Sequence, residues 1–269
     1  MANTPIITMI SDFGIRSHYV AAMKAIIYRI IPEVNIVDVT HNITPYNIYE
    51  AAFLLRNIYF YFPVKTVHLV VVDPEVGGDR KPIVVTTPQH FFVGPDNGVF
   101  SYIYEDCKDT GFSVYHLVES HYFRTQISPT FHGRDIFAPA AAWLARGTNA
   151  EEVGPKLENF TRLNLPQPIV QGNVVTCTIM HIDSFGNAIT NLSKEIYTTL
   201  SQKLGTNKIS VKIGNQIINE ISPSYFALTE KKIGVVFGST DNLEIAVYKK
   251  AAFRELGLNL FAQIQVVFG

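Results

Sequence analysis

The stretch Thr66-Val67-His68-Leu69-Val70-Val71-Val72-Asp73-Pro74 decides which fold this chain can adopt. Its apolar run is short, almost unbroken and rich in valine, which is typical of a strand buried on both faces of a parallel sheet. The run ends at a carboxylate and a proline, which predicts a turn. Because a charged group at the end of a buried strand costs solvation energy unless it is paired or used, we expect Asp73 to have a function.

Other apolar runs alternate with helical patterns in the first part of the chain. Further strands are expected at residues 6–11, 35–39, 82–87 and 90–93, and helices at 18–31 (capped by Ser17), 47–60 and 138–146. This alternation predicts an α/β domain with a mainly parallel sheet over residues 1–164. Ligands bind beyond the carboxyl ends of such strands, where Asp12 and Asp73 both fall.

The pattern changes after Pro166 and Pro168, which mark a linker. Glycines then separate short strand-like runs, at residues 173–182, 208–213, 216–218, 233–237, 243–248 and 263–268, with one helix expected at 193–201. This pattern predicts a small all-β barrel over residues 170–269.

Composition excludes several classes of protein. Hydrophobic residues make up 47% of the chain and charged residues 17%, so a large core is expected and disorder is not. The net charge of −1 gives no nucleic-acid footprint, and no apolar run approaches the roughly 20 residues of a membrane span. Cys107 and Cys177 lack metal-binding spacing and are expected to be reduced thiols. The N-terminal residues show no signal peptide, so we expect a cytoplasmic protein.

A second charged island, Phe131-His132-Gly133-Arg134-Asp135, also lies between apolar segments. With Asp73 and Arg80, His132 could form a carboxylate–guanidinium–imidazole cluster suited to holding water. Arg134 and Asp135 are better explained as a structural ion pair near a helix start.

Taken in order, the motifs along the whole chain resemble those of the S-adenosylmethionine (SAM) hydroxide adenosyltransferases, which are similar to SAM-dependent fluorinases and chlorinases. The motifs are Ser11-Asp12-Phe13-Gly14, Val37-Asp38-Val39-Thr40-His41, Thr44-Pro45-Tyr46, Asp73-Pro74 with Arg80, Gly94-Pro95-Asp96-Asn97-Gly98, Phe131 to Asp135, Asp183-Ser184-Phe185-Gly186-Asn187 with Thr190-Asn191, and Gly238-Ser239 with Leu243-Glu244-Ile245-Ala246.

The resemblance implies an α/β domain, a C-terminal β-barrel and a homotrimer, with SAM at the seam between one subunit's first domain and a neighbour's second domain. It implies displacement at the ribose C5′ by water-derived hydroxide, giving adenosine and methionine. SAM would be the substrate, with no cofactor and no metal.

The resemblance also implies roles for individual residues. Asp73, Arg80 and His132 would be catalytic. The substrate contacts would be Asp12 (ribose hydroxyls), Tyr46 (ribose and methionine side), Phe131 (pocket wall), Asp183 (methionine ammonium), Asn187 (adenine edge), Tyr225 (adenine face) and Ser239 (methionine carboxylate).

Comparison with the halogenase branch favours water as the nucleophile. The halogenases are similar but have a tyrosine at the position of Asp73, and a carboxylate repels a halide. The fluorinases also have a serine where Gly133 stands, whereas the chlorinases have glycine. This chain departs from the halogenase pattern at Ile189 and Val247, which concern the adenine contacts, and at Thr240. Because Thr240 stands where the halogenases have an arginine, we expect carboxylate binding to depend more on backbone N–H groups.

Three alternatives to SAM hydrolysis remain open from the sequence. The first is a chlorinase-like halogenase. The second is a metal-dependent nucleotide phosphatase, since Asp12, Asp38, His41 and Asp96 loosely resemble an acidic metal cluster at strand ends. The third is a non-catalytic SAM or adenosine sensor. The sequence also leaves open which member of the cluster accepts the proton and what purpose SAM breakdown serves.

Overall fold

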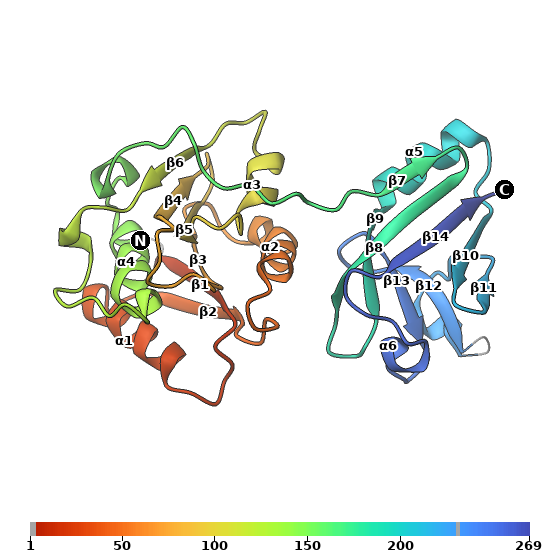
Figure 1. The fold of residues 1–269 in the computed structure, drawn as a ribbon, viewed down its shortest axis with the longest axis horizontal. Coiled ribbons are helices and arrows are strands. Elements are labelled where there is room, and N and C mark those ends of the chain that lie inside the picture. The colour runs from red at the N-terminus through yellow and green to blue at the C-terminus, as the bar shows by residue number, and fades with distance from the viewer. Residues whose placement is uncertain (1–3, 230–231) are drawn as a thin grey trace. The chain divides into compact units, whose positions relative to one another are not determined.

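The chain folds as two compact units that divide between Leu165 and Pro166 (Figure 1). The computed structural model describes residues 4–229 and 232–269. The first unit is the expected α/β domain and the second is the expected small β-barrel, so the predicted fold class is confirmed.

A mostly parallel six-stranded sheet forms the centre of the first unit. Its strands are β1 (Ile6–Ser11), β2 (Asn35–Thr40), β3 (Val67–Val71), β4 (Pro82–Thr86), β5 (Phe91–Pro95) and β6 (Ser113–His116), in the order β2-β1-β3-β5-β4-β6. Strands β2, β1, β3 and β5 are parallel, whereas β4 runs antiparallel to both β5 and β6.

Helices lie on both faces of the sheet (Figure 1), which explains why the central strands β1 and β3 are buried along almost their whole length. The helices are α1 (Tyr19–Ile30), α2 (Ile48–Arg56), α3 (Ser101–Asp106) and α4 (Ala138–Arg146), with short 3-10 turns at Tyr59–Tyr61, Ser120–Tyr122 and Ala150–Val153. Helices α1 and α4 pack together over Met9, Leu69 and Val71, which belong to one buried cluster.

Two helix boundaries differ from the sequence prediction. Ser17 does not cap α1; His18 takes the N-cap position, and its side chain makes no capping hydrogen bond. Helix α2 ends at Arg56 instead of residue 60, and Tyr59–Tyr61 continues as a 3-10 turn. The apolar pattern continues from α2 into the 3-10 turn, so periodicity alone did not locate the end of the helix at Arg56.

The second unit is an antiparallel sheet that curls into a nearly closed barrel. Its strands are β7 (Ile169–Gln171), β8 (Val174–Ile182), β9 (Ala188–Ser193), β10 (Ile209–Ile213), β11 (Gln216–Ile218), β12 (Ile233–Phe237), β13 (Asn242–Val247) and β14 (Gln263–Phe268). The order is β11-β10-β14-β8-β9-β13-β12, and β7 pairs with β8. Helix α5 (Lys194–Leu204), helix α6 (Ala252–Glu255) and the 3-10 turn η5 (Tyr225–Leu228) lie between strands.

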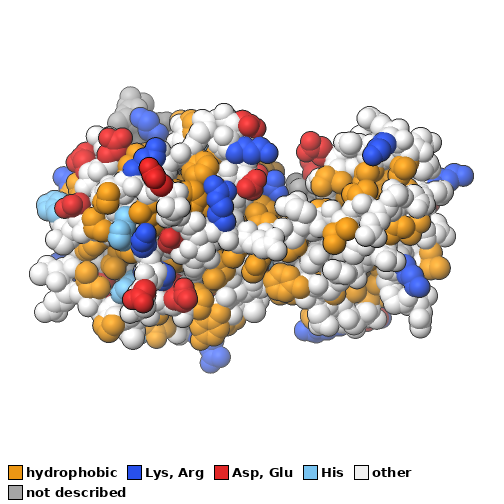
Figure 2. Space-filling model, turned by 45° about the horizontal axis from the view of Figure 1, so that its top comes forward, with side chains coloured by type: hydrophobic (Ala, Val, Ile, Leu, Met, Phe, Trp, Pro, Cys, Tyr) orange, Lys and Arg blue, Asp and Glu red, His pale blue; other side chains and the backbone are white. Residues whose placement is uncertain are grey.

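Positive and negative side chains are interspersed on the face of the molecule that Figure 2 shows. This distribution agrees with the net charge of −1. Among the described residues, no helix combines the length and the hydropathy needed to cross a bilayer.

Candidate active site

Two carboxylates follow neighbouring parallel strands at the same edge of the first unit's sheet. Ser11 at the end of β1 pairs in register with Val71 at the end of β3. Asp12 follows the first and Asp73 lies two residues beyond the second, so both come at the carboxyl ends of strands. This is the edge at which open α/β sheets bind ligands.

Asp73, Arg80 and His132 form a connected cluster at this edge. Nε of Arg80 lies 3.0 Å and 3.1 Å from the two Asp73 carboxylate oxygens, and Nη2 lies 2.5 Å from Oδ2. The same Nη2 lies 2.7 Å from Nδ1 of His132. The Asp73 and Arg80 side chains are almost completely buried, at 5% and 3% exposure. The structure therefore brings His132 into contact with Arg80, which lies 52 positions earlier in the sequence and is itself paired with Asp73.

The geometry assigns a protonation state to His132. A guanidinium nitrogen cannot accept a hydrogen bond, so Nδ1 of His132 must accept and the imidazole proton must lie on Nε2. Burial lowers the pKa of His132, and the positive charge of Arg80 lowers it further. A neutral imidazole with Nε2–H as a donor is the result.

The loop after Asp73 packs closely against the segment before His132. Gly77 has a φ of 81°, and a Cβ there would lie 2.3 Å from the carbonyl oxygen of Pro129. Only glycine satisfies both the left-handed backbone and this close approach. The contact joins the turn that carries Asp73 and Arg80 to the segment that leads into Phe131 and His132.

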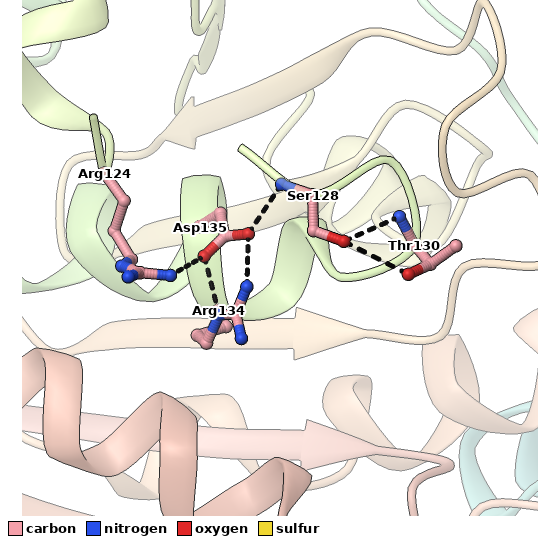
Figure 3. A network of polar contacts seen from close by, with 5 residues as sticks. All are labelled: Arg124, Ser128, Thr130, Arg134 and Asp135. Carbon is pink, nitrogen blue, oxygen red and sulfur yellow. Dashed lines mark hydrogen bonds and ion pairs between the residues drawn. The ribbon is translucent and has the colours of Figure 1, made fainter. Parts of the chain in front are cut away.

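Asp135 holds the segment before His132 in place through hydrogen bonds to its residues (Figure 3). Its side chain is fully buried and accepts hydrogen bonds from Arg134, Arg124 and the backbone N–H of Ser128, at 2.6 to 2.8 Å. Burial opposes ionisation, but these bonds outweigh it and lower the pKa of Asp135 to about 2. The expected structural ion pair between Arg134 and Asp135 is present.

A π-helical turn, Gly133–Phe137, directly follows His132 and leads into α4. Turns of this kind are rare, and they occur frequently at functional sites because the extra residue changes where neighbouring side chains point. Phe137, in this turn, lies with its ring 5.2 Å from the Arg80 guanidinium carbon. The turn thus places an aromatic ring against the Arg80 guanidinium on one side of the Asp73–Arg80–His132 cluster.

Asp12 and Tyr46 are in direct contact. Oδ2 of Asp12 accepts a hydrogen bond from the backbone N–H of Tyr46 at 2.9 Å. Tyr46 has a φ of 67°, which is strained for a residue with a side chain, and its side chain is 71% exposed. The Asp12 carboxylate therefore helps to hold the Tyr46 backbone in an unusual conformation that leaves the aromatic ring exposed.

A chain of polar contacts supports the Asp12 loop. Ser11 Oγ lies 2.7 Å from His41 Nδ1, and His41 Nε2 lies 3.1 Å from Asp38 Oδ1. The other carboxylate oxygen of Asp38 is paired with Lys24. The carbonyl of His41 also accepts from the N–H of Gly14 at 2.7 Å. Asp38 and His41 are thus engaged with neighbouring residues of the first unit.

Phe131 lies beside both the cluster of Asp73, Arg80 and His132 and the loop that carries Asp12. It is 8% exposed, and its ring makes edge-to-face contacts with Phe13 at 5.8 Å and Tyr19 at 5.2 Å between centroids. Phe13 is the neighbour of Asp12, and Phe131 is the neighbour of His132. Phe131, the expected wall residue, therefore lies between the cluster of Asp73, Arg80 and His132 and the Asp12 loop.

In the second unit, Asp183 and Asn187 share one loop. The carboxylate of Asp183 accepts from the backbone N–H groups of Phe185 and Asn187, at 2.9 and 2.8 Å. It also accepts from the Asn187 amide nitrogen at 2.9 Å. Asp183 thus orders this loop, and its bond orients the Asn187 amide.

Tyr225 contacts a residue that the sequence reasoning missed. Its hydroxyl donates to Oε2 of Glu244 at 2.5 Å, and Glu244 is 4% exposed. Ser239 is exposed and follows Gly238, whose Cα lies against the Glu244 carboxyl. The available signal was one acidic residue inside the otherwise apolar run Leu243-Glu244-Ile245-Ala246.

The ten expected site residues therefore fall into two sets. Asp12, Tyr46, Asp73, Arg80, Phe131 and His132 lie in the first unit, and Asp183, Asn187, Tyr225 and Ser239 lie in the second. Within the part of the chain that the structure describes, no group of three or more His, Cys, Asp or Glu side chains is arranged to hold a metal ion.

Two family models match this chain. The model for the SAM hydroxide adenosyltransferase N-terminal domain matches residues 7–154, and the model for the C-terminal domain of the same family matches residues 177–265.

Curated relatives point the same way. The chain is 32% identical to (R)-S-adenosyl-L-methionine hydrolase from Methanocaldococcus jannaschii, over 98% of this chain and 96% of the relative. It is 36% identical to the protein of that name from Salinispora arenicola, over 70% and 72%. A fluorinase from Actinoplanes is 28% identical over 71% and 72%.

Among solved structures, a conserved protein from Thermotoga maritima is similar, with a TM-score of 0.89 and 34% identity. The match covers 97% of this chain and 99% of that one.

Proposed function

The chain belongs to the SAM hydroxide adenosyltransferase family, and from this membership we infer that it is an (R)-S-adenosyl-L-methionine hydrolase. The reaction consumes one water and gives adenosine, L-methionine and a proton. The single observation that supports the chemistry best is the buried contact of Arg80 with both Asp73 and His132.

The demand on this site is to place a weak nucleophile. The sulfonium leaves as a neutral thioether, so no general acid is needed. Water must lie in line with the bond between C5′ and sulfur, and positioning of this kind lowers the barrier substantially. The proposed role of the cluster is to hold that water.

The hydrogen-bond arrangement supports a different task for each of the three residues. Nε2–H of His132 donates to the water oxygen and orients it. Arg80 has only donors, and its bond occupies the Nδ1 lone pair of His132. Asp73 is then the member with oxygen lone pairs left for the proton that water loses as it attacks C5′. We propose that the proton passes to Asp73 and on to solvent.

The charge of the cluster suits a cationic substrate. Asp73 and Arg80 cancel, and His132 is neutral, so the cluster adds no net positive charge beside the sulfonium. A halide would lack the net positive charge that could replace its hydration, and the Asp73 carboxylate would repel it. These charges favour water over chloride or fluoride.

Substrate binding is proposed to use both sets of residues. Asp12 would accept from the ribose hydroxyls and Tyr46 would cover the ribose, with Phe131 as the wall of the reaction pocket. Asp183 and Ser239 would bind the methionine ammonium and carboxylate. Asn187 would read the adenine edge and Tyr225 would stack on its face. In the proposed homotrimer these two sets come from neighbouring subunits.

Product analysis tests the function directly. The purified protein is incubated with (R)-SAM in halide-free buffer containing H₂¹⁸O, and products are separated by chromatography and weighed by mass spectrometry. Adenosine carrying ¹⁸O at its 5′-hydroxyl, with unlabelled methionine, is the expected result. Halogenated adenosine on addition of chloride, or SAM returned intact, would contradict the proposal.

Light scattering coupled to size-exclusion chromatography tests the trimer. The expected particle mass is three times the 30.1 kDa of one chain. A monomer that turns over SAM at full rate would rule out a site shared between subunits.

A further inference from the structure

One carboxyl group is sealed on the outer face of the barrel. On β13, Leu243, Ile245 and Val247 point into the barrel core, and Glu244 alternates with them, so it points to the opposite face. Its partners across the sheet are Ile189 on β9 and Val236 on β12. Glu244 is nevertheless 4% exposed, because other groups cover it.

The first covering group is Tyr225. Its hydroxyl donates to Oε2 of Glu244 at 2.5 Å, whereas the residue as a whole is 44% exposed. A hydrogen bond to a carboxylate is among the stronger ones in proteins. The ring is therefore fixed at its hydroxyl end and retains exposed surface.

The second covering group is the backbone at Gly238. A Cβ at this position would lie 1.6 Å from Oε1 of Glu244 and 2.3 Å from its carboxyl carbon. A side chain at this position would have to displace the carboxyl, so the carboxyl and the turn that begins at Gly238 are in direct contact. Ser239 is the next residue of that turn.

A buried acid is a costly choice for this position. Burial raises the pKa of Glu244, and the nearby charge of Asp183 raises it too, although the Tyr225 bond and His181 act in the opposite direction. A leucine could pack between Ile189 and Val236 without that desolvation cost. A requirement other than packing therefore explains the acid.

We propose that Glu244 is a positioning residue for substrate binding, whose carboxyl fixes the Tyr225 ring as a stacking surface for a purine and fixes the Gly238–Ser239 turn beside it. The proposal rests on the proposed function, in which Tyr225 faces adenine and Ser239 binds the methionine carboxylate. It adds a residue that itself touches neither.

Three variants test this role. Tyr225→Phe removes the hydroxyl and keeps the ring, and Glu244→Leu removes the carboxyl. Glu244→Gln keeps one acceptor oxygen on a side chain of the same length. We expect the first two to raise KM for SAM about tenfold while kcat stays within about twofold, and Glu244→Gln to recover most of that loss. Tyr197→Phe is the matched control, because it removes a tyrosine hydroxyl bond to the Asn207 carbonyl in the same unit.

A second measurement keeps the proposal separate from the proposed function. Calorimetric binding of adenosine needs no turnover, and Tyr225→Phe is expected to weaken it about tenfold where Tyr197→Phe does not. Wild-type KM and adenosine affinity in Tyr225→Phe would overturn the positioning role even if SAM is hydrolysed. Loss of kcat and melting temperature together, with no change in KM, would make Glu244 purely structural. Failure of the wild type to consume SAM would refute only the hydrolase assignment.

Discussion

Nη2 of Arg80 donates to Nδ1 of His132 across 2.7 Å and joins two residues that lie 52 positions apart in the chain. Because the same nitrogen also contacts Asp73, one planar group sets the orientation of both neighbours. A planar fork can do this, whereas an ammonium point charge cannot hold both in the same geometry.

Arg80→Lys is therefore expected to lower kcat at least about a hundredfold while KM changes only a few-fold. Initial rates of adenosine formation measure both constants. Arg56→Lys is the control, since Arg56 also binds a carboxylate, that of Asp106, through two nitrogens but at the surface. Equal losses in both variants would show that the buried fork has no special role.

The protonation state of His132 predicts the pH dependence. Burial and Arg80 lower its pKa below the ordinary 6.5, and protonation would remove the Nδ1 acceptor and set two positive charges side by side. We expect kcat/KM to be level above pH 6.5 and to fall at lower pH. His132→Gln should abolish this acid limb along with most of the rate. A wild-type midpoint above pH 7 would contradict the assigned tautomer.

Asp12→Ala is expected to act on binding. It removes the proposed ribose acceptor and also the acceptor for the strained Tyr46 N–H. KM should rise about tenfold or more, with a smaller effect on kcat. Asp12→Asn retains one oxygen for Tyr46 and separates the two contributions. Unchanged SAM affinity in Asp12→Ala would argue against any ribose role.

Acid stability should depend on His68, which is fully buried and has a pKa lowered to about 3, mainly by burial. The unfolded chain takes up a proton below pH 6.5 that the folded state refuses. Stability is therefore complete above pH 6.5 and falls as the pH drops toward 3, by up to about 1.4 kcal/mol per pH unit from this group.

His68→Phe should flatten the dependence of unfolding free energy on pH between 6.5 and 4, because it removes the titrating imidazole. Phenylalanine can keep the stack on Phe92, so the packing at this position is retained. Urea unfolding at several pH values measures the slope. Exposed His18→Gln is the control. The lowered pKa of Asp135 contributes only further down, since its stabilisation is lost between its ordinary 3.8 and about 2. An unchanged slope in His68→Phe would show that the buried imidazole is not the group responsible.

Asp135→Asn should destabilise the first unit by about 3 kcal/mol, because it leaves Arg124 and Arg134 without their buried counter-charge. Chemical unfolding at pH 7 measures this change. Asp106→Asn, which breaks a surface pair, should cost less than about 1 kcal/mol. Equal costs would mean that the network in Figure 3 is no stronger than a surface contact.

Sequence reasoning succeeded where one physical signal dominates. The apolar runs of β1 and β3 identified buried parallel strands, and the carboxylates after them come at the same edge of the sheet. Charged residues between apolar segments pointed to Arg80 and His132, and in the structure Arg80 contacts both Asp73 and His132.

Prediction from the sequence failed where tertiary contacts decide the local structure. The π-helical turn after His132 and the positive φ of Tyr46 depend on contacts that are distant in sequence, so no local pattern announces them. Glu244 was overlooked because strand alternation accounts for one polar residue on an outer face. Its burial depends on Tyr225, which arrives from a separate segment.

The packing around Gly133 limits how this protein could change its nucleophile over evolution. An added Cβ would lie 3.2 Å from Val71 Cγ1, 3.3 Å from Met23 Sδ and 3.4 Å from a Phe131 ring carbon. A serine at this position, as the resemblance gives for the fluorinases, would require the Val71 and Met23 side chains to shift by a few tenths of an ångström. A path toward fluoride chemistry that passes through this position would therefore also need room made by the Val71 and Met23 side chains beneath it.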